Sequence, residues 1–425
     1  MKKTQKWMVV GAAVVACFAA GLYATLAAPG TEGAAAASEE AEAVKWAPAV
    51  EPKPLTENVN RGIAFLLKTQ HKSGGWAQGE ESTQMGHSQD NLRDKPNVAD
   101  TCVATLALIR AGSTPSKGPH AAAIRNALGF ICSQIEEADG KSLFITSIRG
   151  TRVQMKLGTY VDTFLAAMVL AEAKDQMPDA AGNTRILAAL DKTMDKIERN
   201  QQKDGTWDNR GWAPTLTQGM ASKALNRAAQ SGYTVSEQVR GKAETYARKR
   251  FDKSNGGFDK AGSAGVQLYA DAAGLGAMQD SDNTNGTLRA ELEATARSAK
   301  PSAARAEARQ ALDRHRENAE DLKTVRQNIV KKVDDPNFIR GFGSNGGEEF
   351  LSYMNIGESL VVKNDDAWTK WDTQISANLN RIQNKDGSWT GHHCITGRTF
   401  CTSAALLCLT VDRAPVPVAG KIRKR

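Results

Sequence analysis

The chain has 425 residues, with 55 lysines and arginines against 47 aspartates and glutamates and a formal net charge of +8. The basic excess lies at the two ends, so residues 29–420 hold 48 basic and 47 acidic side chains. A nucleic-acid-binding domain concentrates its basic residues on the folded body, and this neutral body argues against such a partner. The composition also excludes collagen-like, disulfide-dense and multi-span membrane proteins.

The first 28 residues are typical of an export signal. Residues 1–6 carry three lysines, and residues 7–28 carry no charge, which is the pattern of a basic n-region followed by an apolar h-region. The uncharged run is also long enough to span a bilayer. We therefore expect export to the periplasm, cell envelope or medium. Three fates stay open: cleavage near Ala28, lipidation at Cys17, or retention as a membrane anchor.

Residues 29–54 are rich in alanine, glutamate and proline. A segment of this composition buries little apolar surface, so we predict a tether. At the other end, residues 412–425 form a basic tail. The five cysteines beyond Cys17 are an odd number and do not form a disulfide framework.

Four short segments resemble one another, and each follows a helical pattern. Each segment places one or two glycines before an aromatic residue, and a glycine tolerates the positive φ that ends a helix. The aromatic side chain can then fold back onto that helix. The segments are residues 70–76, 202–207, 252–258 and 383–389.

A more apolar helix follows each turn, and six such helices can be aligned. One aligned column holds mostly polar side chains at the helix start. Self-similarity at a spacing of about 50–60 residues predicts stacked helix pairs, each of which buries its second helix against its neighbours. The polar column is Asp100, Asp162, Gln218, Asp271, Asn355 and Thr402.

The pattern of Gln, Asp-Gly, Ser or Thr, and Trp in residues 202–207 and 383–389 resembles the prenyltransferase and squalene-oxidase repeat. Terpene cyclases and protein prenyltransferase β subunits share that repeat. The resemblance covers residues 55–411 and implies an all-α fold, an α/α toroid of about six helix pairs whose chain ends meet. It also implies a barrel that binds an apolar or isoprenoid-like ligand.

Residues 287–335 depart from the repeat. They are rich in Ala, Arg and Glu, nearly free of aromatics, and have high helix propensity. We predict a long solvated helix or hairpin inserted in the toroid. A protein-binding arm is the alternative.

The sequence offers weak catalytic candidates only. The acidic motifs with which terpene cyclases start their reaction are absent, which leaves the column residues Asp100, Asp162 and Asp271. Capping of helix N-termini is the default role for them; a polar ring at the cavity mouth is the functional alternative. Three tyrosines two positions earlier either line that mouth and bind ligand or pack between repeats: Tyr160, Tyr269 and Tyr353.

A zinc site is the sharpest alternative. The resemblance to prenyltransferases, which hold zinc with an Asp-x-Cys pair and a distant histidine, points to Asp100 and Cys102 with His392 or His393. A closed toroid makes the first and last repeats neighbours, which could bring these groups together. Against this reading, Cys102 has the character of a small core residue.

Three functions therefore follow from the sequence. The first is binding of an apolar or isoprenoid-like molecule, with catalysis left open. The second is a non-catalytic interaction scaffold at the cell envelope, and the third is a zinc-dependent transferase.

Overall fold

The computed structural model describes residues 45–82 and 91–418. The export signal and most of the tether lie outside these residues. Among the described residues, no helix combines the length and the apolar character needed to cross a bilayer.

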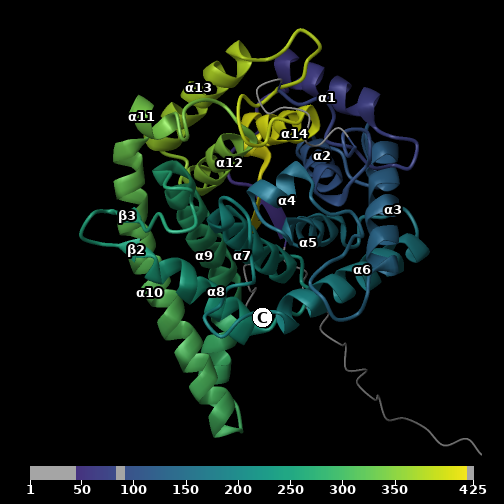
Figure 1. Cartoon of the computed structure of the whole chain (residues 1–425). Coiled ribbons are helices and arrows are strands. Elements are labelled where there is room, and N and C mark those ends of the chain that lie inside the picture. Colours follow the sequence, from purple (N-terminus) through teal and green to yellow (C-terminus); the bar gives the residue numbers. More distant parts are fainter. Residues whose placement is uncertain (1–44, 83–90, 419–425) are drawn as a thin grey trace, which may run out of the picture. The chain divides into compact units, whose positions relative to one another are not determined.

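The predicted all-α toroid is confirmed by the contacts between the helices (Figure 1). Six inner helices each pack on the next, and the last packs on the first, which closes a ring. Six outer helices surround that ring. The inner helices are α2 (Val98–Arg110), α5 (Val161–Ala173), α7 (Pro214–Gln230), α9 (Gln267–Ser298), α12 (Gly347–Val361) and α14 (Arg398–Leu409). The outer helices are α1 (Glu57–Thr69), α3 (Ala121–Glu137), α6 (Ala180–Arg199), α8 (Glu237–Lys249), α10 (Ser302–Lys332) and α13 (Asp366–Arg381).

The inner helices are buried on all sides. Helix α5 is buried along its whole length, whereas the outer helix α6 buries a single stripe that includes Ile186, Leu190 and Ile197. The outer helices cover one side of the inner ring, and side chains of the ring itself fill the other. The α5 residues that face the middle of the ring are thus as buried as those that face the outer helices.

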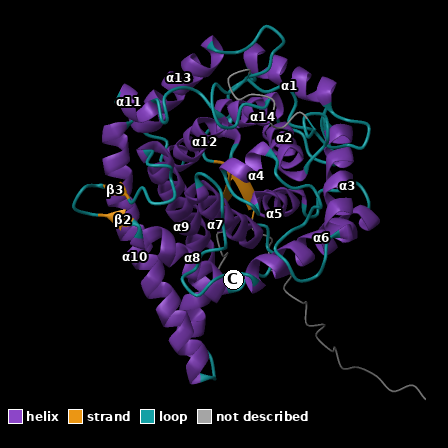
Figure 2. Cartoon of the chain, viewed as in Figure 1, coloured by secondary structure: helices purple, strands orange, loops and turns teal. Residues whose placement is uncertain are grey.

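Two short antiparallel ribbons interrupt the helical pattern (Figure 2). Strand β1 (Lys45–Pro48) pairs with β4 (Pro415–Val418), and β2 (Phe251–Asp252) pairs with β3 (Gly257–Phe258). The first ribbon shortens both the tether and the tail relative to the sequence prediction. Strands β1 and β4 come from opposite ends of the chain and are short and proline-rich. No local sequence pattern therefore predicts that they pair.

The four similar segments connect neighbouring helices, and we call them staples. In three of the four, a tryptophan binds the preceding outer helix; the segment 252–258 has Phe258 in its place. Each indole Nε1 donates a hydrogen bond to a backbone carbonyl ten residues earlier. The bonds run from Trp76 to Leu66 (2.8 Å), from Trp207 to Ile197 (2.7 Å) and from Trp389 to Leu379 (2.8 Å).

A glutamine in the same staple reaches the next outer helix. Its side-chain amide donates to a carbonyl there and also to the carbonyl of the turn glycine. The pairs with the next helix are Gln70 with Ala123 (2.9 Å), Gln201 with Val239 (2.9 Å) and Gln383 with Asn58 (2.8 Å). Gln201, not Gln202, is thus the repeated residue, and the last staple joins α13 to α1 and closes the outer ring.

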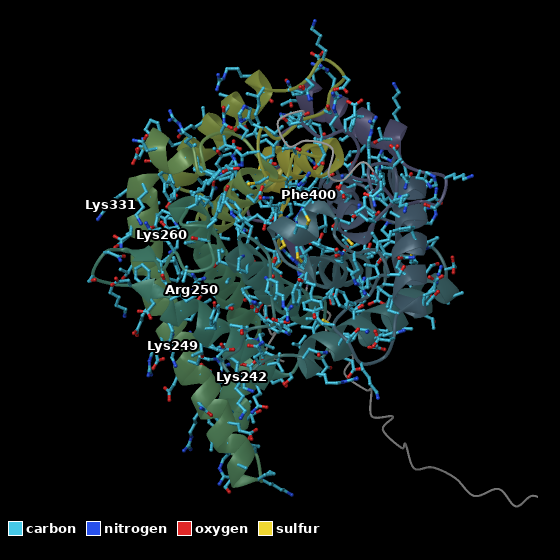
Figure 3. The ribbon with its side chains drawn as sticks, viewed as in Figure 1. Lys242, Lys249, Arg250, Lys260, Lys331 and Phe400 are labelled. Atoms are coloured by element: carbon cyan, nitrogen blue, oxygen red, sulfur yellow. The ribbon has the colours of Figure 1, made fainter. Side chains whose placement is uncertain are left out.

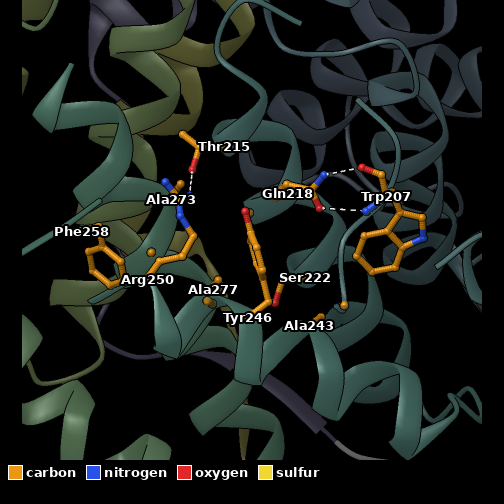
Figure 4. A pocket seen from close by; sticks show the side chains of 14 residues that line it. Trp207, Thr215, Gln218, Ser222, Ala243, Tyr246, Arg250, Phe258, Ala273 and Ala277 are labelled. Carbon is orange, nitrogen blue, oxygen red and sulfur yellow. Dashed lines mark hydrogen bonds between the residues drawn. The ribbon is translucent and has the colours of Figure 1, made fainter. Parts of the chain in front are cut away.

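The staples also form hydrogen bonds to the inner helices. These bonds correct one position in the column of polar residues that the sequence alignment placed at the helix starts. The backbone N–H of the aromatic residue donates to a side chain near the start of the next inner helix; Figure 4 shows the pair of Trp207 and Gln218. In the first repeat the acceptor is Thr101, not Asp100. The four pairs are Trp76–Thr101 (2.9 Å), Trp207–Gln218 (3.2 Å), Phe258–Asp271 (2.9 Å) and Trp389–Thr402 (2.9 Å).

Replacing Trp207 by phenylalanine should lower the free energy of unfolding by about 1–2 kcal/mol, because the Ile197 carbonyl loses its partner in a buried setting. Urea unfolding followed by circular dichroism measures this change. Trp46→Phe is the control, since the Trp46 Nε1 has no hydrogen-bond partner. Equal losses in the two variants would contradict the staple.

Residues 287–335 form the end of α9, the whole of α10 and the connection to the short helix α11 (Pro336–Ile339). Helices α9 and α10 make a long hairpin that extends from the ring in Figure 1. Helix α10 is also the outer helix of the fifth pair, and it buries Leu322, Val325 and Ile329. The segment is therefore part of the repeat and not only an addition to it.

Candidate functional site at the N-terminal rim

The inner helices all begin at the same end of the ring. The backbone N–H of Ala99 in the first turn of α2 donates to Asp162 Oδ1 in the first turn of α5 (3.0 Å). Likewise, the Tyr269 hydroxyl at the start of α9 donates to Glu349 at the start of α12. We call this end the N-terminal rim.

Two adjacent carboxyl groups, Glu348 and Glu349, lie completely buried in this rim. The Ile395 N–H donates to Glu348 Oε2 (3.2 Å), and the Phe342 N–H donates to Glu349 Oε1 (3.0 Å). The remaining oxygens, Glu348 Oε1 and Glu349 Oε2, have no hydrogen-bond partner. Buried polar atoms are nearly always paired, so this pair of free oxygens marks a candidate site.

Burial keeps these carboxyl groups protonated near neutral pH. It raises the pKa of Glu348 to about 8, helped by the neighbouring Glu349, and it raises the pKa of Glu349 to about 7. Burial also lowers the pKa of His393, whose Nε2 lies 3.5 Å from Glu349 Oε2. A neutral carboxyl can donate a hydrogen bond or a proton, which a carboxylate cannot.

Asp100 and Asp162 extend the acidic cluster. Asn97 Nδ2 donates to Asp100 Oδ2 (2.8 Å), and Gln154 Nε2 donates to Asp162 Oδ2 (2.7 Å). Asp100 Oδ1 is free, and burial raises the pKa of Asp100 to about 7. The N-cap residues are Asn97 for α2 and Tyr160 for α5, so neither aspartate is the N-cap of its own helix; Asp162 instead accepts a first-turn N–H of the neighbouring helix α2.

Aromatic and apolar side chains cover the carboxyl pair. The Trp212 ring meets Tyr269 (6.4 Å between centroids) and Phe342 (5.0 Å), both edge-on, and Phe342 meets His393 (5.2 Å). Phe342 is 52% exposed, and Met155 in the short helix α4 (Arg152–Lys156) is 40% exposed. We call this group the rim site: Trp212, Tyr269, Phe342, Glu348, Glu349 and His393.

The Phe342 loop needs its glycine to fit around Glu349. Gly341 has φ +63°, and a Cβ at this position would lie 2.5 Å from Glu349 Oε1. The backbone therefore approaches the carboxyl group more closely than any other residue type allows.

The predicted site residues separate in the structure. Asp271 is bound by Gln267 Nε2 (2.7 Å) and Lys332 Nζ (2.9 Å), within the third staple. Tyr160 packs on Phe144 (4.6 Å between centroids), and the Tyr353 hydroxyl donates to the Ile339 carbonyl (2.7 Å) beside outer helix α13. Of the three tyrosines, only Tyr269 contributes to the rim site.

The four predicted metal ligands have separate surroundings. Cys102 is buried in the core, His392 is exposed, and His393 Nε2 lies 2.9 Å from the Ser344 carbonyl. Across residues 45–82 and 91–418, no three His, Cys, Asp or Glu side chains are grouped so that they could hold a metal ion.

Glu348 and Glu349 were missed by the sequence analysis. Two acids in the first turn of a helix are ordinary, because they complement the helix dipole. A signal was present: a glycine-rich run, residues 341–347, directly precedes them.

Comparisons with known proteins give distant structural similarity. No family model and no curated protein matches the chain. Among solved structures, the type II terpene cyclase MstE from Scytonema is similar at 14% identity and a TM-score of 0.46, covering 83% of this chain and 96% of that one. A glycosidase is similar at 14% identity and a TM-score of 0.33, covering 84% and 96%. The toroid assigned above follows from the chain's own helix contacts.

The raised pKa values predict a stability that falls as pH rises. The folded state holds more protons than the unfolded state between about pH 4.5 and 8, because Glu348, Glu349 and Asp100 titrate later when folded. We expect the free energy of unfolding to drop by several kcal/mol over this window, since each unit of pKa shift corresponds to about 1.4 kcal/mol; urea unfolding at several pH values measures the drop.

Glu348→Gln should flatten this slope. Glu136→Gln is the control, because Glu136 is exposed and its hydrogen bond to Arg185 lowers its pKa. A wild-type stability that rises between pH 5 and 8 would contradict the assignment.

Proposed function

We propose that this toroid binds a small molecule with an apolar body, such as an isoprenoid-like compound, at the rim site and not in the middle of the ring. The observation that carries the proposal is the pair of unpartnered buried oxygens, Glu348 Oε1 and Glu349 Oε2, beneath an exposed aromatic cover. Ligand sites typically combine an apolar lining with a few convergent polar groups of this kind.

The exposed apolar surface at the same place supports the proposal. Among the described residues, four large hydrophobic side chains are strongly exposed, and Phe342 and Met155 are two of them. Trp212 links the two segments that carry them, since its backbone N–H donates to the Met155 carbonyl (3.1 Å) and its ring meets the Phe342 ring. Contiguous exposed apolar groups mark interaction sites more often than scattered ones.

Organic extraction of the purified protein, followed by mass spectrometry, tests the proposal. We expect a small molecule to co-purify with the wild type and to be lost from Phe342→Asp, which places a charge in the apolar cover. Leu187→Asp is the matched control, because Leu187 is also exposed (41%) but lies on outer helix α6. Absence of any bound molecule, or equal retention in the two variants, would refute the proposal.

A scaffold function is the second candidate, and a groove favours it. A polar groove of about 1070 Å³ lies between α8 and α10 and is lined by both signs of charge, including Lys242, Lys249 and Glu317. Figure 3 shows Lys242 and Lys249 on this side of the molecule. A protein partner held here should be lost when residues 289–300 are replaced by a short turn, while any extracted small molecule is retained.

Export to the cell envelope remains part of the proposal and is supported by the pattern of residues 1–28. A reporter enzyme that is active only after export, fused behind residue 54, should be active. An inactive reporter would refute export, and fractionation would distinguish an anchored from a released product.

A further inference from the structure

We infer that the molecule bound at the rim site carries a cationic head group, an organic ammonium that lies between the Glu348–Glu349 pair and the Trp212 ring. The inference rests on the proposed function and deepens it. Three observations carry it: the excess of acidic groups in the rim, the free carboxyl oxygens, and a cation of the protein already placed on the same aromatic ring.

Among the described residues, acidic groups outnumber basic ones in the set formed by the buried acids of α2, α5 and α12 and the charged groups that interact with them. Arg152 pairs with Glu81 through two hydrogen bonds (2.8 and 2.9 Å). Arg149 lies near Asp162, and Lys156 lies near Glu348. Burial disfavours the ionised forms of Glu348 and Glu349, and a bound cation would stabilise those ionised forms, so a molecule with its own positive charge is the ligand that this rim accommodates best. The five acids are Glu81, Asp100, Asp162, Glu348 and Glu349, against the three cations Arg149, Arg152 and Lys156.

Lys156 shows that the aromatic cover accepts a cation. Its Nζ lies 5.2 Å from the centroid of the Trp212 ring, within the range of a cation–π interaction. Lys156 belongs to α4, a five-residue helix at the surface of the rim, and its side chain is partly exposed. A ligand ammonium can therefore replace the Lys156 ammonium on the ring while Lys156 moves into solvent.

An organic cation fits the site better than a metal ion. The described residues contain no group of three metal-binding side chains, and His393, whose Nε2 lies 3.5 Å from Glu349 Oε2, already has that nitrogen 2.9 Å from the Ser344 carbonyl. The exposed Phe342 and Met155 side chains offer an apolar surface for the body of the same molecule.

Calorimetric titration of the full chain with three ten-carbon probes below their micelle concentrations tests the inference. The probes are decyltrimethylammonium (cationic), decanoate (anionic) and decanol (neutral). We expect decyltrimethylammonium to bind about tenfold more tightly than decanol, as one cation–π contact and one charge pair predict, and decanoate to bind least.

Three variants make the result specific. The double variant Glu348→Gln/Glu349→Gln should bind decyltrimethylammonium only as tightly as decanol. The variant Trp212→Leu should bind decyltrimethylammonium severalfold more weakly than the wild type does. Lys156→Met should strengthen cation binding, because the competing ammonium is gone, whereas a merely structural Lys156 would weaken it. The exposed Glu291→Gln on the α9–α10 hairpin is the control and should change nothing.

The outcomes separate the inference from the proposed function. Equal affinity for the cation and decanol, both lost in Phe342→Asp, would overturn the cationic head group and leave apolar binding intact. No binding of any probe would overturn both. If the double glutamine variant does not fold, the Trp212 and Lys156 variants still decide the question, since unchanged cation affinity in both would overturn the inference.

Discussion

Replacing Gly387 by alanine should lower the free energy of unfolding by about 3 kcal/mol or more. Gly387 has φ +89°, and a Cβ there would lie 2.5 Å from the backbone carbonyl oxygen of Arg61. The substitution thus combines an unfavourable backbone conformation with a clash that no side-chain movement relieves.

The location of Gly387 adds to the effect. Its staple connects α13 to α1, and Arg61 Nη2 donates to the carbonyls of Asn384 (3.0 Å) and Lys385 (2.9 Å) across the same junction. Loss of this staple opens the ring where the first and last repeats meet.

Urea unfolding measures the change. Gly140→Ala is the control, because nothing lies within 4 Å of a Cβ at that position and its φ is not positive. A Gly387→Ala protein as stable as the Gly140→Ala protein would show that the ring does not depend on this junction.

Replacing Glu358 by glutamine should also lower the free energy of unfolding by about 3 kcal/mol. Glu358 lies at the opposite end of the ring. Glu358 is bound by Lys223 Nζ (2.7 Å) and lies 3.4 Å from Arg110 Nη2. Lys223 also binds Asp280 (2.9 Å), and Arg110 lies 3.3 Å from Glu172. Arg227 of α7 also lies 3.4 Å from Glu172, so three cations face three carboxylates, and this buried network joins five of the six inner helices.

The same network predicts acid sensitivity. Burial would raise the pKa of Glu358, but Lys223 and Arg110 outweigh it and lower the pKa to about 2. A lowered carboxyl pKa stabilises the fold above the unfolded value near 4.5, and that stability is lost as pH falls toward 2. We expect the wild type to be more stable than Glu358→Gln at neutral pH, and we expect this difference in free energy of unfolding to disappear as pH falls across this range.

Glu293→Gln is the matched control. Glu293 makes an exposed ion pair with Arg289 (3.0 Å), and exposed pairs contribute less than about 1 kcal/mol. Equal losses in Glu293→Gln and Glu358→Gln, measured at pH 7, would show that the buried network is not a main source of stability.

The fold could be predicted from sequence because its staples are local. The helix carbonyl, the turn glycine and the tryptophan that bonds to that carbonyl lie within ten residues of one another, so they recur as a recognisable sequence pattern. Ring closure is different: the contact of Gln383 with Asn58 joins the ends of the toroid, and only the family resemblance implied it. Neither a local sequence pattern nor the family resemblance predicted the β1–β4 ribbon.

The rim site could be predicted only in part. Tyr269 and His393 were singled out, but for a cavity mouth and for zinc respectively, and they meet instead at Glu349. The alignment followed acidic residues and so chose Asp100, whereas hydrogen bonding selects Thr101 one residue later. Sequence shows which residues recur but not whether a particular acid is buried.

A crystal structure of the protein with decyltrimethylammonium is the most direct test of the rim site. We predict electron density for the alkyl chain against Phe342 and Met155, with the ammonium between Trp212 and the Glu348–Glu349 pair and with Lys156 displaced. Density inside the ring, in the groove between α8 and α10, or nowhere on the protein would contradict the assignment of this site.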